Sequence, residues 1–362
     1  MQEKPLFDHD PLTAIEAITM AQMLAFGPIA FHAIVVMRDR GILEALAKNR
    51  RKNGLAIETI SEECGLSHYA TRVLLEAGLG LKLVWRRDEL YHLAKLGYFV
   101  LTDEMTRINF DFTRDVCYGA ATQLDAALST GKPAGLKTLG PWDTLYQGLS
   151  AMPEPAMSSW HNFDHFYSDQ AFPVMVEKLA AENPSSLLDI GCNTGKWAYT
   201  CLQRLPDLRI GLVDLEPQLE RAIAHLTPLE ATTPPKCYPL DMLDPMVRLP
   251  DGYDIIWMSQ FLDCFSEQEI IAILCKVKEG LKPGAKVWIL ELFWDRQRFE
   301  AAALSLQQTS LYFTCVANGN SQMYDSEVFF DLIRASGLTI SSVTDNVGQY
   351  HTLIECTAST SL

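Results

Sequence analysis

The sequence lacks the patterns that would identify a disulfide-rich, zinc-binding or repeat protein. No C-x-x-C pair occurs among its nine cysteines, and it contains no internal repeat and no low-complexity run. It therefore predicts neither a disulfide framework nor a thiolate zinc site, and no metal ion is expected. Unpaired cysteines are typical of a reducing compartment, so we expect a cytoplasmic protein.

Positive charge is also scarce. The chain has 30 Lys and Arg against 45 Asp and Glu, for a net charge of -15. The first 110 residues hold 13 basic and 14 acidic side chains, so the excess of acid lies in the rest of the chain. Such a balance repels phosphate backbones and anionic lipids, and we expect no nucleic-acid or membrane partner.

No segment has the full pattern of a signal peptide or a membrane span. Residues 1–10 are acidic and lack the basic-then-apolar order of a signal peptide. Residues 18–37 carry no Lys, Arg, Asp or Glu, but Gln22, His32 and the Gly27-Pro28 pair interrupt them. We expect two helices here, buried in a core or in a subunit contact that makes the protein a homodimer through its N-terminal domain.

The pattern of residues 56–97 is typical of a helix-turn-helix. Thr59-x-x-Glu62 predicts a capping box at the start of a short helix, and residues 69–78 continue as a second helix. Residues 81–93 alternate in character and predict a hairpin, which would complete a winged helix.

A winged helix is associated with DNA binding, so a ligand-responsive regulator is an alternative function. The second helix offers only His68 and Arg72 for such contacts, with Lys82, Arg86 and Arg87 in the wing. Because the segment is not net basic, we favour a structural or dimerising role.

From residue 172 onward, short apolar strands alternate with helices. This predicts a parallel sheet with helices on both faces, and Ser266-x-x-Glu269 predicts a capping box on one of the helices. The expected parallel strands are 186–190, 210–213, 237–240, 253–258 and 286–290, followed by an antiparallel pair at 339–343 and 351–356.

The predicted fold class is α/β. It is a doubly wound, Rossmann-like domain with a mostly parallel sheet and an antiparallel C-terminal strand, preceded by a mainly helical winged-helix domain. We place the N-terminal dimerisation domain at residues 1–110, connecting helices that contribute to a substrate cleft at 111–170, and the catalytic domain at 171–362.

The candidate ligand site follows the first predicted strand, in Asp189-Ile190-Gly191-Cys192-Asn193-Thr194-Gly195. Gly191 permits a tight turn and Gly195 close packing of the next helix. The dinucleotide fingerprint G-x-G-x-x-G is absent because Asn193 occupies the place of its second glycine, which opposes a nicotinamide dehydrogenase. Asp189 suits a ligand with an ammonium group.

Carboxylates also follow the next two strands. Asp214 can accept both hydroxyls of a ribose, and Asp241 is placed to receive an adenine amine. Leu188–Gly195, Val213-Asp214, Leu240-Asp241-Met242 and Leu281-Lys282-Pro283-Gly284-Ala285 resemble the ordered motifs of class I S-adenosylmethionine-dependent methyltransferases.

With the winged-helix segment, nearly the whole chain resembles the small-molecule O-methyltransferases typified by plant caffeate and bacterial polyketide enzymes. The resemblance implies S-adenosyl-L-methionine as cofactor and a hydroxyl of an aromatic or polyketide-like metabolite as acceptor. It implies cofactor contacts from Asp189, Gly191, Cys192, Asn193, Gly195, Asp214, Leu215, Asp241, Met242, Ser259, Phe163 and Tyr167, with Phe166 as a further aromatic candidate.

The catalytic base of that family is a His after the fourth strand, and Asp263 stands in its place here. Glu291 matches one of the two Glu residues that orient the family His, while Gln322 or Met323 falls near the other. Asp263 and Glu291 are therefore the catalytic candidates, because a paired carboxylate can have a raised pKa.

Several alternatives to a catalytic Asp263 remain open. Asp263 could instead cap a helix or bind a polar group of the acceptor. His161, His165 and His351 are other candidate bases. Loss of the family His also permits a non-catalytic cofactor-binding protein.

Overall fold

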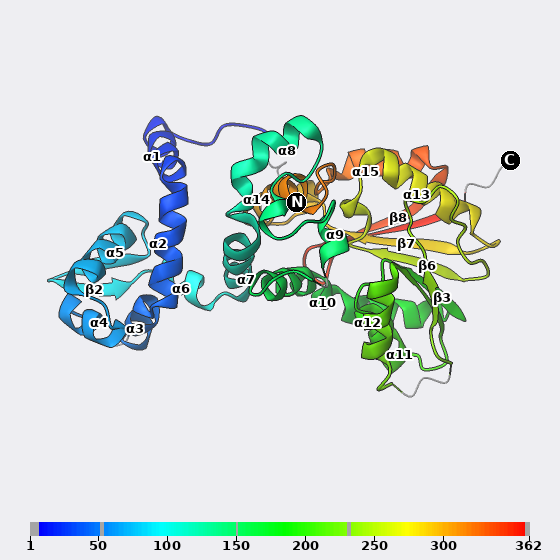
Figure 1. Cartoon of the computed structure of the whole chain (residues 1–362), viewed down its shortest axis with the longest axis horizontal. Coiled ribbons are helices and arrows are strands. Elements are labelled where there is room, and N and C mark those ends of the chain that lie inside the picture. The colour runs from blue at the N-terminus through cyan, green and yellow to red at the C-terminus, as the bar shows by residue number, and fades with distance from the viewer. Residues whose placement is uncertain (1–6, 51–53, 150, 230–232, 359–362) are drawn as a thin grey trace. The chain divides into compact units, whose positions relative to one another are not determined.

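The computed structural model describes residues 7–50, 54–149, 151–229 and 233–358. It divides into two compact units, Met1–Thr113 and Arg114–Leu362 (Figure 1). The boundary follows Thr113, so most of the segment 111–170, predicted as a connection, belongs to the second unit. Residues 1–6, which carry part of the signal-peptide argument, lie outside the described residues.

The first unit is helical with one hairpin. Its core is built from buried aliphatic side chains, including Met37, Leu43, Ile60 and Leu75. Its elements are α1 (Ala14–Ala25), α2 (Gly27–Asp39), α3 (Ile42–Lys48), α4 (Ile57–Cys64), α5 (His68–Gly80), β1 (Val84–Arg87), β2 (Leu90–Leu93), α6 (Lys95–Thr102) and α7 (Glu104–Phe112).

The uncharged stretch forms two helices, as predicted. α1 ends before Phe26, and α2 begins at Gly27 with Pro28 in its first turn, where proline is tolerated. In the part of the chain that the structure describes, no single helix is long and apolar enough to cross a membrane. α1 and α2 meet the length and composition criteria only together, as a pair bent by 72°.

Two predicted capping boxes have opposite outcomes. The one at Ser266 is confirmed, since its hydroxyl accepts from the Glu269 N–H and the Glu269 carboxylate accepts from the Ser266 N–H at 2.8 Å. The one at Thr59 is wrong, because α4 already begins at Ile57 after the extended residue Ala56. Ile57 packs against the domain core, which favours the earlier start.

The second unit opens with helices that precede the sheet. These are α8 (Leu124–Thr130), α9 (Leu145–Gly148) and the long α10 (Ala156–Glu182), with short turns η1 (Thr113–Cys117), η2 (Ala120–Gln123) and η3 (Leu136–Thr138). α10 leads directly into the first strand of the sheet through Asn183, which ends the helix in the left-handed conformation.

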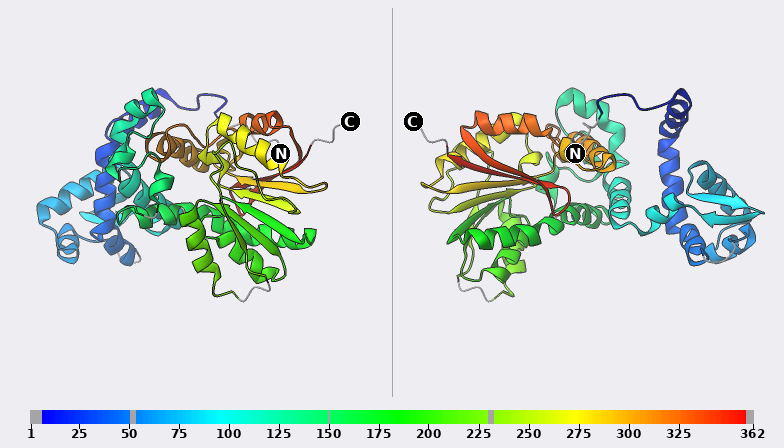
Figure 2. Two further views of the ribbon diagram at one scale, coloured as in Figure 1. Left: turned by 45° about the vertical axis from the view of Figure 1, so that its right-hand side comes forward. Right: turned by 180° about the vertical axis from the view of Figure 1, so that it is seen from behind.

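The sheet has seven strands in the order β5-β4-β3-β6-β7-β9-β8. β3 to β7 run parallel, while β9 pairs antiparallel with both β7 and β8 (Figure 2). The five parallel strands and the terminal antiparallel pair are as predicted. Their bounds are β3 (Ser186–Ile190), β4 (Arg209–Asp214), β5 (Lys236–Pro239), β6 (Ile255–Ser259), β7 (Lys286–Glu291), β8 (Leu338–Val347) and β9 (His351–Ala358).

Helices cover both faces of this sheet (Figure 1). Alternate residues of a strand point to opposite faces, so Leu187 and Trp257 join one buried cluster with α10 and α11, while Leu188 and Met258 join another with α13 and α15. The remaining elements are α11 (Lys196–Arg204), α12 (Glu216–Leu226), η4 (Leu262–Cys264), α13 (Glu267–Glu279), η5 (Trp294–Arg296), α14 (Glu300–Tyr312), η6 (Phe313–Ala317) and α15 (Ser326–Ala335).

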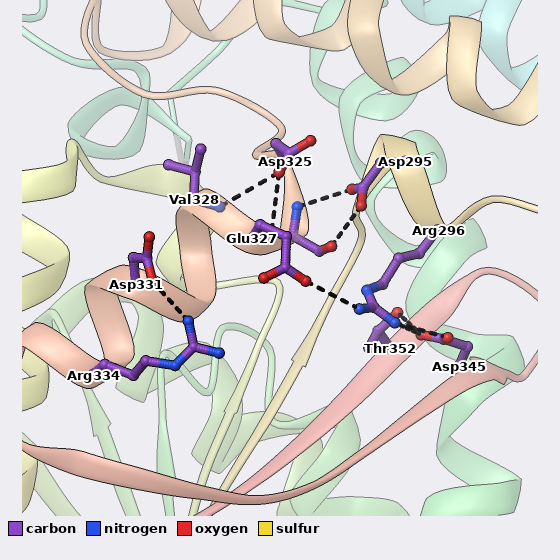
Figure 3. A network of polar contacts seen from close by, with 10 residues as sticks. Asp295, Arg296, Asp325, Glu327, Val328, Asp331, Arg334, Asp345 and Thr352 are labelled. Carbon is purple, nitrogen blue, oxygen red and sulfur yellow. Dashed lines mark hydrogen bonds and ion pairs between the residues drawn. The ribbon is translucent and has the colours of Figure 1, made fainter. Parts of the chain in front are cut away.

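A polar network ties the segment after β7 to the C-terminal strands and to α15 (Figure 3). Arg296 pairs with Asp345 of β8 at 3.0 Å and with Glu327 of α15 at 3.8 Å. The neighbouring Asp295 accepts from the backbone N–H of Ser326 at 2.9 Å. These contacts fix the chain just beyond Glu291, at the carboxyl end of β7.

Candidate active site

The turn after β3 requires a left-handed backbone at three positions. Gly191, Asn193 and Gly195 have φ values of 75°, 48° and 73°. A Cβ on Gly191 would lie 2.3 Å from the Phe261 ring, and one on Gly195 would lie 3.1 Å from the Ala222 Cβ. Gly191 is therefore needed for close approach as well as for its conformation.

Asn193 connects this turn to two carboxylates. Its backbone N–H donates to Asp214 at 2.8 Å, and its side-chain amide donates to Asp164 at 3.2 Å. Asp214 also accepts from the Leu215 N–H at 2.7 Å. Burial raises the pKa of Asp214, and the two backbone hydrogen bonds oppose that effect.

Asp189 is buried at the end of β3, and its Oδ2 has no hydrogen-bond partner among the described residues. Burial, and then the charge of Asp214, raises the pKa of Asp189 well above its usual value. An unpartnered acceptor of this kind suits a ligand that brings a cationic donor. Asp241 is exposed and accepts from the Leu243 N–H at 2.8 Å, whereas Met242 is buried.

These groups border a cavity of about 370 Å³ in the second unit. Nine of the residues nominated from the sequence line it: Asp189, Gly191, Cys192, Asn193, Asp214, Leu215, Asp241, Met242 and Ser259. The structure therefore brings together the carboxyl ends of β3, β4 and β6 with the segment after β5, as expected for an open α/β sheet.

Five nominated residues do not line the cavity. They are Gly195, Phe163, Tyr167, Asp263 and Glu291. Gly195 faces α12 instead, and Phe163 and Tyr167 pack against each other, with Tyr167 also against Tyr350. Phe166, Gln322 and Met323 are also outside the lining.

Glu291 and Asp263 are buried beside each other behind the cavity wall. Glu291 Oε1 accepts from the N–H groups of Phe261 and Leu262 at 3.1 and 2.9 Å. Burial raises the pKa of both carboxyls, and the charge of Asp263 adds to the effect on Glu291. Asp263 is only 4% exposed, while the next residue, Cys264, lines the cavity.

Among the three histidine candidates, only His165 lines the cavity. Burial lowers the pKa of His165 to about 4 and that of His351 to about 3, so both side chains are neutral at pH 7. His351 Nε2 lies 3.1 Å from the Gln260 amide oxygen. His161 Nδ1 lies 2.8 Å from the Met157 carbonyl oxygen.

The sequence analysis expected helices within residues 111–170 to contribute to a cleft, but it did not nominate four side chains of α10 that line the cavity. These are Trp160, Asp164, Ser168 and Phe172. They are four residues apart, and this spacing places side chains on one face of a helix. The signal was thus present in the sequence, as two polar residues between two aromatic ones at helical spacing. Tyr146, Cys264 and Asn318, from three other segments, also line the cavity and were also missed.

Comparison with known proteins supports the methyltransferase class that the sequence motifs resemble. Residues 19–91 match the Dimerisation2-like domain family and residues 188–287 match the Methyltransferase domain family. The L-tyrosine C(3)-methyltransferase of Streptomyces lavendulae is 24% identical over 321 residues, which cover 87% of this chain and 85% of that one.

Two solved structures share the fold. The S-adenosylmethionine-dependent methyltransferase SibL has a TM-score of 0.71 at 21% identity, covering 94% of this chain and 99% of that one. The mitomycin 7-O-methyltransferase MmcR has a TM-score of 0.69 at 19% identity, covering 95% and 98%. The fold, the strand-end carboxylates and the family matches define this chain as a two-domain S-adenosylmethionine-dependent methyltransferase, which confirms the predicted class and cofactor.

The cavity residues fit this cofactor. When the cofactor is bound, the unpartnered oxygen of Asp189 would accept from an ammonium group, Asp214 has acceptor capacity left for hydroxyls, and the unpartnered Ser259 hydroxyl would be a further polar contact. When bound, S-adenosylmethionine supplies a methyl group on a positively charged sulfur. The protein's task is then to align the acceptor, exclude water and receive a proton. In the part of the chain that the structure describes, no group of three metal-ligating side chains is close enough to hold an ion.

Replacing Asp214 by alanine should weaken cofactor binding. We expect Asp214→Ala to lower the affinity for S-adenosylhomocysteine by about 1.5 to 3 kcal/mol, the range for a hydrogen bond to a charged group. Titration calorimetry measures this loss, with exposed Asp251→Ala as the matched control. Unchanged affinity of Asp214→Ala would exclude the assigned contact.

Gly191→Ala should also impair binding, because a Cβ meets the Phe261 ring at a positive φ. We expect a loss of about tenfold or more in affinity for S-adenosylhomocysteine, equivalent to 1.4 kcal/mol. Gly252→Ala is the control, since Gly252 has a φ of 82° but nothing within 4 Å of an added Cβ. Equal affinities of the two variants would show that crowding at Phe261 is unimportant.

Proposed function

We propose that the protein methylates a hydroxylated aromatic or polyketide-like small molecule. The observation that carries this proposal is the composition of the cavity beyond the strand ends, where Tyr146, Trp160, Phe172 and Phe265 provide aromatic surface. Such surface favours a flat, apolar acceptor. The names of the relatives reported above, an L-tyrosine C(3)-methyltransferase and a mitomycin 7-O-methyltransferase, support the same acceptor class.

The methylated atom is either the hydroxyl oxygen or a ring carbon beside it. Oxygen is our leading assignment from the family resemblance. Methylation of carbon is supported by the similarity to the L-tyrosine C(3)-methyltransferase, to which 87% of this chain aligns. Both reactions need an electron-rich phenol, so the acceptor class is the same.

The acceptor proposal predicts methyl transfer to phenols by the unmodified protein. We expect labelled methyl groups from S-adenosylmethionine to enter phenolic acceptors but not their methyl ethers, because the ether cannot form the anionic nucleophile. Mass spectrometry detects the product, and nuclear magnetic resonance assigns the methyl group to oxygen or carbon. Asp214→Ala serves as the negative control.

A protein that binds S-adenosylhomocysteine but methylates no phenol would contradict the proposed acceptor class and favour the non-catalytic alternative. Nothing in the described residues favours a DNA-binding regulator. We also propose a cytoplasmic location, since all nine cysteines are free thiols and a reducing compartment keeps them so.

We further propose that the N-terminal unit forms a homodimer. α1, α2 and Phe26 between them expose eight large apolar side chains: Ile15, Ile18, Met20, Met23, Leu24, Phe26, Ile29 and Val36. An apolar surface of this kind is typical of a protein interface. The match of residues 19–91 to the Dimerisation2-like domain supports a second copy of the chain as the occupant.

The dimer proposal predicts a mass of about twice 40.5 kDa by light scattering at micromolar concentration. Leu24→Glu should shift the protein toward monomer, because it places a charge in the apolar contact. Tyr69→Glu is the control, since Tyr69 is 77% exposed on α5, outside α1 and α2. A monomeric parent, or a parent that binds lipid vesicles through this surface, would refute the dimer.

A further inference from the structure

Asp164 lines the cavity and contacts the turn that borders the cofactor candidates. One oxygen of its carboxylate is held at 3.2 Å by the side chain of Asn193, from that turn. Asp164 also acts electrostatically on Cys264, which lines the cavity, and on Tyr312. Its side chain is 27% exposed. A proton acceptor must be accessible to the acceptor hydroxyl in this way.

Asp263 does not have this access. It is 4% exposed and outside the lining, and its Oδ1 faces the Cys264 thiol at 3.5 Å. The neighbouring Glu291 is itself held in place and does not move Asp263 into the cavity, because Glu291 Oε1 accepts from the backbone N–H groups of Phe261 and Leu262. Asp164 borders the cavity, whereas the residue in the place of the family His does not; Glu269 also borders it, but its carboxylate is occupied by the capping box at Ser266.

The charges around Asp164 favour a proton acceptor that works near neutral pH. Burial, followed by the charge of Asp263 and opposed by Lys196, raises the pKa of Asp164 to about 7. Asp169 adds to the rise, but it is paired with Lys196 at 2.6 Å. His165 lies 3.9 Å away and is neutral, since burial lowers its pKa to about 4. A base is most effective when its pKa is near the working pH.

We propose that Asp164 is the proton acceptor for the acceptor hydroxyl. The inference rests on the proposed function. In oxygen methylation the O–CH₃ bond forms, the S–CH₃ bond breaks with its electron pair left on sulfur, and the hydroxyl proton passes to the Asp164 carboxylate. In carbon methylation the same carboxylate takes the phenolic proton, and the displaced ring proton leaves to solvent.

The first test compares Asp164→Asn with the parent on a phenol that the parent methylates. We expect kcat to fall by about 100-fold or more, with nearly unchanged affinity for S-adenosylhomocysteine. With a nitrophenol that is already ionised, kcat of Asp164→Asn should fall much less, because this acceptor needs no base. Glu177→Gln, which removes an exposed carboxylate from the same helix, should retain the parent rate.

Full activity of Asp164→Asn would overturn the proposal while leaving the proposed function intact. A fall in rate matched by an equal fall in cofactor affinity would also overturn it, since Asp164 would then be a cofactor contact. If the parent itself methylates no phenol, the proposed function fails and the assignment of Asp164 fails with it.

The second test uses the pH dependence of kcat/KM. Asp263→Asn removes a negative charge beside Asp164, so the pKa of Asp164 should fall and the acidic limb of the profile should move to lower pH. An unmoved limb would overturn the assignment of that limb to Asp164.

Infrared spectroscopy provides a readout that does not depend on turnover or on Asp263→Asn folding. In the parent, the carboxyls of Asp164 and Asp263 should both titrate near neutral pH, and Asp164→Asn should remove one of the two signals. Persistence of both signals in Asp164→Asn would show that Asp164 does not titrate in this range, which would overturn the proposal.

Discussion

The hydrogen bond between the backbone N–H of Asn193 and Asp214 holds the site together. It joins the turn after β3 to the end of β4, and it requires the left-handed turn that begins at Gly191. The same residue donates its side-chain amide to Asp164 on α10. One asparagine, in the place where a dinucleotide-binding protein has glycine, thus links two strand ends to the helix that borders the rest of the cavity.

Carboxylates that line the cavity give this site its second property. Asp164 and Asp189 both have raised pKa values, mainly because burial disfavours the charged form. A ligand that brings positive charge would stabilise the charged form of both, which accounts for why a cavity lined by carboxylates suits a cationic cofactor.

The two units differ in what they expose and in what they enclose. The first has its own aliphatic core and exposes apolar side chains on α1 and α2. The second contains the sheet and every residue that lines the cavity. The proposed dimer contact thus lies in the first unit, and the residues of the candidate active site lie in the second.

The sequence by itself determined what depends on neighbours in the chain. Short apolar runs between helical stretches predicted the strands, Ser266 and Glu269 predicted a helix start, and the Asp189–Gly195 motif predicted one border of the cavity. Only the tertiary structure decided which carboxylate reaches the cavity. Asp263 is enclosed and Asp164 is accessible because side chains from segments far apart in the chain pack around each, and side-chain exposure is set by such distant contacts rather than by local pattern.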